Sequence, residues 1–505
     1  MQQSGSFGLT DTVSLENVVD TEVLIVGAGN AALAAAVAAR EQRAEVVVLE
    51  KAPKSQRGGN SALTVHMRFP YSGIEDLLPL LSDVSEGGTR SLAERVGEYT
   101  ESDYYDDIMA VTDGQSDPAL ARMLVSNAYE TVLWMRSYGH AWTPSHESPT
   151  SANVVSFDGG GYAMQERWFR AAERLHTPVH YETRAVELLT DRTGAVTGVL
   201  ARTGMRDVRY NARTVILACG SFESSPEMRQ QYLGAGWDKV KLRGVPFNTG
   251  DGLNMALELG AQPHGSWSTC HASPQDSNRP EYDLPGPGVS GVYWSRYSYP
   301  FGITVNVDGK RFVDEGETWR GLTYAKTGRA ILSQPNGLAF QIFDAEQRRK
   351  GLIRGYEDAT VFKSNELGAL ADDLGIRDAG SFLETIRDFN ASIQNGDFHP
   401  FRIDGKSTAG ITPPKSNWAL PIATPPFEAY PTICGMTFTY GGLKITSSGE
   451  VLHESGRVIP GLFAAGEMVG GLWHDNYPSG GGMMAGAVFG RIAGTKAARQ
   501  AQSGN

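Results

Sequence analysis

Cysteine is scarce in this chain of 505 residues, which contains only Cys219, Cys270 and Cys434, far apart in the sequence. None of the three belongs to a CxxC or CxxCH pattern. That absence excludes a disulfide framework, a zinc ribbon and a covalently attached c-type haem. We therefore predict no metal site.

Long apolar runs and basic runs are missing as well. The longest apolar stretch, residues 31–39, is far shorter than the roughly 20 residues that a membrane-spanning helix needs. The first twenty residues are polar and acidic, without the basic start and apolar core of a signal peptide. The formal net charge is −12, and no basic run is present to neutralise nucleic-acid phosphates. We expect a cytoplasmic protein with no integral membrane segment and no nucleic-acid partner.

Glycine, by contrast, is abundant, with 59 residues and no collagen-like period. Such a surplus favours tight turns and close approaches between backbone and ligand. Residues 22–26 and 46–49 are apolar runs of strand length, and residues 31–40 are predicted to form the alanine-rich helix between them. Gly27 and Gly29 begin a GxGxxA turn before this helix. Its glycines permit a tight turn and bring backbone amides close to a pyrophosphate.

Two further residues complete this nucleotide-binding pattern. Ala32 allows the helix to pack closely on the strand, and Glu50 ends the second strand, where an acid can accept both ribose hydroxyls of an adenosine. Beyond this unit, the pattern predicts helices at 118–138 and 162–175 and strands at 179–181, 185–189, 196–201 and 214–218.

Three later segments favour FAD over a nicotinamide nucleotide. The segment RGGNS at 57–61 has the position that follows the pyrophosphate toward the flavin in many flavoproteins. The segment GLFAAGE at 461–467 is a strand closing on glycine and an acid, the usual form for holding a ribityl chain. GGGMM at 480–484 opens the final helix, whose N-terminus would favour an anionic reduced flavin.

These residues carry a resemblance to a known family. The segments VGAGNAA, LEK, GGNS, LACGSF, NTGDGLNMALELGA, RFVDE, TYGGL and GLFAAGE resemble those of the fumarate reductase/succinate dehydrogenase flavoprotein family along nearly the whole chain. Within the family the chain is most similar to tricarballylate dehydrogenases, through DGQSDPALARML, RFVDEGE, TPPKSNWALPI and TFTYGGL. The resemblance implies an α/β fold, in which a Rossmann-like FAD-binding domain of the GR2 type holds an inserted α+β cap domain.

The expected domain boundaries lie at two stretches rich in proline and glycine. Residues 276–291 look like the crossing into a new unit, and residues 412–433 look like the crossing back. We expect an FAD-binding domain in two parts, 1–275 and 425–505, around a substrate-binding cap at 276–424.

The motifs and the resemblance together imply a set of FAD contacts. They are Gly27, Gly29, Asn30, Ala31, Ala32, Glu50, Lys51, Gly58, Gly59, Asn60, Ser61, Val186, Ala218, Gly220, Asp251, Gly466, Glu467, Gly482, Met483 and Met484. Succinate dehydrogenases bond the flavin covalently to a histidine beside the GGNS-like segment. Here Ala62 and Leu63 follow that segment, and His66 does not stand at the position of the family's histidine. We therefore predict noncovalent FAD.

The chain departs from the family where fumarate reductases hold a dicarboxylate. The segment that carries a histidine there reads FTYGG from Phe438, without one. The arginine expected before the C-terminal glycines is missing, and Asp475 and Asn476 stand near that point. Losing a cation removes charge-assisted hydrogen bonds, and an acid adds repulsion. Arg348 matches the proton-delivering arginine of fumarate reductases, but without these partners a structural role is favoured.

The same C-terminal segment resembles the Tyr-Pro-x-x-Gly motif of 3-ketosteroid dehydrogenases, matched by Tyr477 and Gly481. In that branch the tyrosine hydroxyl and the glycine amide hold the ketone oxygen. The branch also uses a second tyrosine as base, but Trp319 stands at its position here. Tyr324, Tyr297 and Tyr299 are the substitutes by proximity. Arg320 and His271 are further candidate substrate contacts, and Glu315 is an acid that could instead pair with Arg311 or Arg320.

An aromatic-rich stretch in the expected cap, residues 291–302, favours a hydrophobic substrate. We therefore predict an FAD-dependent dehydrogenase that forms a C=C bond α,β to a carbonyl, preferably in a ketone of 3-ketosteroid type. The alternatives are a tricarballylate dehydrogenase or fumarate reductase type of enzyme acting on a small polycarboxylate, and a non-catalytic flavin-binding redox sensor. The electron acceptor stays unidentified.

Overall fold

A computed structural model describes residues 18–82, 86–94, 96–145 and 155–503. Its strands are β1 (Val18–Val26), β2 (Val46–Leu49), β3 (Trp142–Pro144), β4 (Val155–Phe157), β5 (Val179–His180), β6 (Thr183–Thr190), β7 (Val196–Thr203), β8 (Arg206–Leu217), β9 (Lys241–Leu242), β10 (Pro263–Asp276), β11 (Ile303–Asn306), β12 (Leu338–Phe343), β13 (Phe362–Ser364), β14 (Phe427–Leu443), β15 (Glu450–Leu452) and β16 (Val458–Ala464). Its α-helices are α1 (Asn30–Glu41), α2 (Ile74–Leu77), α3 (Glu86–Ala93), α4 (Glu101–Val111), α5 (Pro118–Ser137), α6 (Gly160–Arg174), α7 (Pro226–Leu233), α8 (Asp251–Glu258), α9 (Tyr324–Leu332), α10 (Ala345–Arg349), α11 (Leu367–Asp373), α12 (Ala379–Ser392) and α13 (Gly481–Ser503).

The larger sheet has the strand order β15-β16-β8-β1-β2-β5, with β7 joined to β8 and β6 joined to β7. Strand β1 is parallel to both β2 and β8, and β16, from the C-terminal part of the chain, is parallel to β8. In this register Val26 lies opposite both Leu49 and Leu217. The carboxyl ends of the three strands therefore meet at one edge, where open α/β sheets bind their ligands. The predicted α/β class and strand–helix–strand unit are confirmed.

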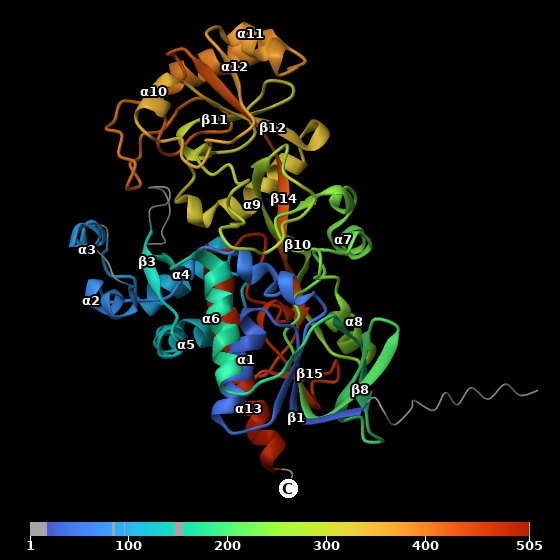
Figure 1. The fold of residues 1–505 in the computed structure, drawn as a ribbon. Coiled ribbons are helices and arrows are strands. Elements are labelled where there is room, and N and C mark those ends of the chain that lie inside the picture. Colours follow the sequence, from blue (N-terminus) through green and yellow to red (C-terminus); the bar gives the residue numbers. More distant parts are fainter. Residues whose placement is uncertain (1–17, 83–85, 95, 146–154, 504–505) are drawn as a thin grey trace, which may run out of the picture.

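Helices α1 and α13, the first and last of the described chain, pack against each other with α6 beside α1 (Figure 1). Small residues make this close approach possible. A Cβ atom on Gly490 would lie 2.4 Å from the carbonyl oxygen of Ala31, and one on Gly494 would lie 2.2 Å from that of Ala35. Only glycine fits at such distances. The C-terminal helix is thereby held against the nucleotide-binding turn.

The second sheet has the order β10-β14-β12-β11, with β9 and β13 also paired to β14. Strands β10 and β14 are 14 and 17 residues long, and they connect the lower part of the molecule to the upper part, which contains α10, α11 and α12 (Figure 1). The upper part has apolar clusters of its own, built around Ile303, Phe340 and Phe382 in one cluster and Phe343 and Trp418 in another.

The second sheet corrects one sequence-based expectation. The crossing back from the cap was expected to extend to residue 433, but β14 already begins at Phe427. Pro431 therefore lies inside the strand, opposite Phe340, and its carbonyl oxygen accepts a hydrogen bond from the Ser277 amide. Proline has no N–H to donate, so this position contributes only an acceptor to the sheet. Within the described ranges, no helix combines the length and the apolar character needed to cross a membrane.

Candidate active site

A long cavity begins at the carboxyl edge of the larger sheet and continues beneath the second sheet. Most of the predicted FAD contacts line it. Four are not among its lining residues: Ala32, Gly58, Val186 and Met484. Ala32 and Met484 are fully buried in helix packing, and the Gly58 carbonyl accepts a hydrogen bond from Gln165.

The turn after β1 is shaped for a close ligand. Gly27 has a φ of +104°, and a Cβ atom there would lie 2.5 Å from the carbonyl oxygen of Ala218 on the neighbouring strand. Helix α1 begins at Asn30, whose amide donates to the Ser61 hydroxyl at 3.2 Å, and whose side-chain amide donates to the Met483 carbonyl at 2.8 Å. The N-terminus of this twelve-residue helix presents N–H groups and a positive dipole end to the cavity.

Glu50 lies at the end of β2, as predicted, and is buried. Its two carboxylate oxygens accept hydrogen bonds from the amides of Ala28 at 3.0 Å and Ala52 at 2.7 Å. Burial raises the pKa of this carboxyl, although both amides and the Lys51 charge act to lower it. Lys51 itself is bound to Asp251 at 2.9 Å. The residues present fit the pyrophosphate and ribose of FAD.

A pair of acids, the buried Glu223 and the half-buried Glu467, lies at the cavity wall. Glu467 accepts a hydrogen bond from the Thr439 amide at 2.9 Å, and Glu223 accepts one from the Asn60 side chain at 2.9 Å. Burial raises the pKa of Glu223 to about 7. Burial, and then the charge of Glu223, raise the pKa of Glu467 well above its usual range. Near neutral pH the pair therefore keeps at least one proton. Sequence reasoning found Glu467 through its motif but missed Glu223.

The other end of the cavity is built from aromatic rings. His271 lies with its ring centre 4.9 Å from Tyr324, 5.2 Å from Phe438 and 5.4 Å from Tyr477. Tyr297 is 5.2 Å from Tyr324. All five residues line the cavity, and they come from β10, β14, α9 and two loops. Tertiary structure thus brings three of the four predicted tyrosines together.

Tyr477 and Gly482 form a pair of adjacent hydrogen-bonding groups. The Gly482 N–H donates a hydrogen bond to the Tyr477 hydroxyl oxygen at 3.3 Å, and both residues line the cavity. The sequence instead predicted Gly481 as the partner amide. Its N–H is already donated to the Pro478 carbonyl at 3.0 Å, and Gly481 does not line the cavity. The turn at Pro478 therefore places Gly482 where Gly481 was expected.

Burial determines the charge states of this aromatic cluster. It raises the pKa of Tyr324 well above 10, aided by Tyr477 and Tyr297, and it raises the pKa of Tyr477 as well. Burial, with a contribution from Arg243, lowers the pKa of His271 well below 6.5. At neutral pH the two phenols are hydrogen-bond donors and the imidazole is uncharged.

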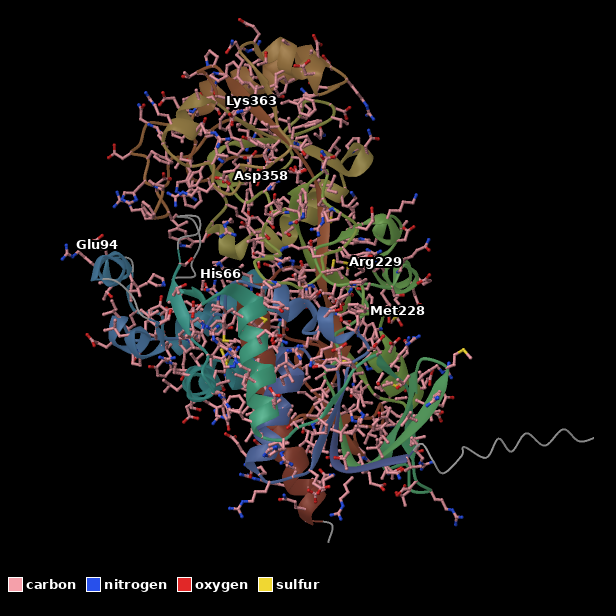
Figure 2. The ribbon with its side chains drawn as sticks, viewed as in Figure 1. His66, Glu94, Met228, Arg229, Asp358 and Lys363 are labelled. Carbon is pink, nitrogen blue, oxygen red and sulfur yellow. The ribbon has the colours of Figure 1, made fainter. Side chains whose placement is uncertain are left out.

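Tyr299 does not belong to this cluster. It is buried outside the cavity lining, and its hydroxyl lies 2.6 Å from that of Thr323. Tyr299 thus lies apart from the other three predicted tyrosines, and the structure gives it a packing position beside Thr323. Tyr293 is also turned away, since its hydroxyl binds Asp358 in the upper part of the molecule (Figure 2). Of the aromatic residues expected at 291–302, only Tyr297 faces the cavity.

The charged side chains differ most from the sequence-based expectation. Asp475 was expected to repel a carboxylate substrate, but its carboxylate binds Arg329 at 2.7 Å and does not line the cavity. Arg348 is also outside the cavity, bound to Glu428 at 2.6 Å, which agrees with a structural role.

Two arginines do face the cavity. Arg320 lies 4.7 Å above the Tyr297 ring, and Arg243 lies 5.9 Å from the same ring. Sequence reasoning missed Arg243, because no recognised motif includes it. Glu315, another candidate, is a structural acid that binds Arg311 and the Thr304 amide. In the described ranges no cluster of three or more histidine, cysteine or acidic residues is arranged to hold a metal ion.

Comparison with known proteins identifies the class of this site. A family model described as an FAD binding domain matches residues 22–64 and 80–484. The chain belongs to this flavoprotein family. A probable fumarate reductase of Shewanella frigidimarina is 28% identical over 503 residues, which cover 95% of this chain and 75% of the relative. A 3-oxosteroid 1-dehydrogenase of Mycobacterium tuberculosis is 27% identical over 381 residues, which cover 70% of this chain and 65% of the relative.

A solved structure gives the same result. The open conformation of a flavocytochrome c3 fumarate reductase matches with a TM-score of 0.71 and 25% identity, covering 96% of this chain and 79% of the other. The flavoprotein is thus an FAD-dependent oxidoreductase that acts on CH–CH groups of a small molecule.

His66 lines the cavity next to α6 (Figure 2), with its Nδ1 atom 3.3 Å from the Val155 carbonyl. Noncovalent attachment of FAD stays a prediction.

Proposed function

We propose that this flavoprotein oxidises or reduces the C–C bond next to a carbonyl group whose oxygen is bound by Tyr477 and Gly482. The observation that carries the proposal is the hydrogen bond that the Gly482 N–H donates to the Tyr477 hydroxyl oxygen at 3.3 Å, which places both groups at one point of the cavity wall. A bound carbonyl oxygen has two lone pairs, so it can accept from the Tyr477 hydroxyl and from the Gly482 N–H when that N–H exchanges the tyrosine oxygen for the substrate.

The two donors suit the charge that develops during this reaction. Removing a proton from the carbon α to a carbonyl places negative charge on the oxygen. A preorganised donor stabilises such an oxyanion by a factor on the order of 10²–10³ in rate. Bound FAD accepts the hydride that leaves the β carbon, or returns it in the reverse direction.

We assign the proton transfer to Tyr297. Its hydroxyl oxygen is buried and has no hydrogen-bond partner among the described residues. Arg320 and Arg243 lie 4.7 Å and 5.9 Å from its ring, so the hydroxyl is in a part of the cavity wall that also carries cations. Tyr324 has a raised pKa and stays a donor, so it suits substrate orientation better than proton abstraction.

The neutral phenols and the Phe438 ring support a ketone with a large apolar body, of 3-ketosteroid type. A second candidate is a carboxylate substrate, as in the polycarboxylate branch of the family. The observation favouring it is that Arg243 and Arg320 both face the cavity. Loss of the family's clamp residues weakens this candidate less than the sequence suggested, since Asp475 lies outside the cavity.

The experiment is anaerobic mixing of the oxidised holoenzyme with 3-ketosteroids, tricarballylate and succinate, followed by the bleaching of flavin absorbance. Bleaching by one of these compounds identifies a substrate. With that substrate, we expect Tyr477→Phe to slow the bleaching by a factor on the order of 10²–10³. The matched control is Tyr299→Phe, which removes a buried hydroxyl outside the cavity and should leave the rate unchanged. Equal rates for wild type and Tyr477→Phe would rule out the proposed oxygen site.

A further inference from the structure

Arg243 is a cavity residue that no family motif includes and that takes no part in the proposed oxygen site. It follows β9 and is partly buried. Its Nε atom donates to the Gly291 carbonyl at 2.8 Å, and its Nη1 atom is 3.3 Å from the Thr437 hydroxyl. These two contacts hold the guanidinium between the start of the cap and β14. No hydrogen bond from Nη2 to a described residue is present.

The positive charge of Arg243 has no ion-pair partner among the described residues. No described carboxylate lies within 4.0 Å of its guanidinium. Asp283, whose charge helps to raise the pKa of Arg243 against the opposing effect of burial, is already bound to Arg279 at 2.8 Å. A charge removed from bulk water without an ion-pair partner is costly, and proteins keep such groups mainly where a ligand supplies the opposite charge.

The described carboxyl groups that line the cavity do not supply the negative charge that Arg243 lacks. They are Glu50, Asp251 and Glu467. Glu50 and Asp251 surround the predicted adenosine-binding end, where Asp251 binds Lys51. Glu467 is a protonated acid of the pair with Glu223, because its pKa is raised well above the usual range. The aromatic end of the cavity therefore combines the guanidinium groups of Arg243 and Arg320 with the uncharged phenols of Tyr324 and Tyr477 and the uncharged imidazole of His271.

We propose that Arg243 binds a carboxylate of the substrate while Tyr477 and Gly482 bind its carbonyl oxygen. This inference rests on the proposed function. A row of neighbouring rings joins the carbonyl-binding pair to Arg243. The Tyr477 ring lies 6.4 Å from the Tyr324 ring, the Tyr324 ring lies 5.2 Å from the Tyr297 ring, and the Tyr297 ring lies 5.9 Å from the Arg243 guanidinium. The substrate class is thus an oxo acid with one carboxylate and an apolar or aromatic body. A planar guanidinium matches a carboxylate through paired N–H donors, which an ammonium group does not provide.

The test uses two probes of nearly the same shape, of which 4-acetylbenzoate is an anion and 4-acetylbenzamide is neutral. Both carry a ketone and an aromatic body, and neither has a CH–CH bond that the enzyme could dehydrogenate. Titration calorimetry on the oxidised holoenzyme measures their dissociation constants. We expect the acid to bind more tightly than the amide by about 10- to 100-fold, the range for hydrogen bonds to a charged group. Equal affinities, or no binding of either probe, would overturn the inference.

Variants then assign the preference to one side chain. Arg243→Gln should bring the dissociation constant of the acid to within about threefold of that of the amide, while Arg243→Lys should restore only part of the preference. Arg348→Gln is the matched control, since it removes an arginine outside the cavity and should leave the preference intact. An unchanged preference in Arg243→Gln would overturn the inference.

Failure of this inference is distinguishable from failure of the proposed function. The probes report binding without turnover, so an acid preference that depends on Arg243 stands even if no ketone bleaches the flavin. Conversely, bleaching that depends on Tyr477, together with equal affinities for acid and amide, keeps the proposed reaction and removes the carboxylate from its substrate. If Arg243→Gln fails to fold, equal affinities of the wild-type enzyme for the two probes still overturn the inference, and a preference that Arg243→Lys retains in full overturns it as well.

Discussion

The acids Glu223 and Glu467 should make the stability of the holoenzyme fall as the pH rises, and Glu223→Gln should remove the part of this effect that belongs to Glu223. Glu223 is 1% exposed, and its Oε1 atom accepts hydrogen bonds from the side chains of Asn60 and Asn248. Glutamine has the same shape, retains an oxygen that can accept these bonds, and carries no charge. The substitution therefore tests charge without creating a cavity.

The magnitude follows from the pKa of Glu223, which burial raises from 4.5 to about 7. An acid whose pKa is raised in the folded protein binds its proton more tightly there than in the unfolded chain. Below about pH 4.5 both states are protonated and folding carries no penalty. The penalty grows as the pH rises and is complete above about pH 7. A difference of about 2.5 pKa units corresponds to roughly 3 kcal/mol of lost stability.

The assay is urea unfolding of the wild type and Glu223→Gln at about pH 5 and about pH 8, with the same excess of FAD, because bound ligand shifts apparent stability. We expect the variant to gain roughly 2.5 kcal/mol relative to the wild type between the two pH values, because a small part of the penalty is already present at about pH 5. Glu454→Gln, at an exposed position, should show no such gain. An identical pH dependence in Glu223→Gln and wild type would refute the reasoning.

Two further predictions concern packing and surface charge. Gly490→Ala should cost about 1–3 kcal/mol of stability, because the added Cβ atom would lie 2.4 Å from the Ala31 carbonyl oxygen in the α1–α13 contact. Gly368→Ala, in a helix with open space around it, should be neutral or stabilise by up to about 1 kcal/mol, and equal effects in urea unfolding would contradict the packing argument. Asp475→Asn should change stability by less than about 1 kcal/mol, because its ion pair with Arg329 is half-exposed. It should also leave the affinity for 4-acetylbenzoate unchanged in calorimetry, whereas a tenfold gain would show that this charge reaches the cavity.

The FAD-binding half was readable from the sequence because its constraints are local. Gly27 and Glu50 each belong to a short motif whose backbone shape leaves few alternatives, and both line the cavity as predicted. The resemblance extended this reading to Ser61 and Glu467, and they line the cavity as well. Val186 was expected to contact FAD because the resemblance places a family contact there. In the structure its neighbour Ala185 lines the cavity and Val186 does not.

The substrate end could not be read in the same way, because its side chains come from segments far apart in the chain. Arg243 stands outside the recognised motifs, and only the packing of β9 and β14 brings it beside Tyr297. Asp475 occupied a position that suggested repulsion, yet its partner Arg329 is 146 residues away in sequence and holds it outside the cavity.

By itself, then, the sequence determined the fold class, the family and the cofactor, since turns, caps and strand ends are dictated by residues a few positions apart. Tertiary structure decided which groups face the substrate and which are charged. The choice between Gly481 and Gly482 depends on one N–H donated to the Pro478 carbonyl. The proton on the Glu223–Glu467 pair depends on burial, and burial is a property of the whole fold.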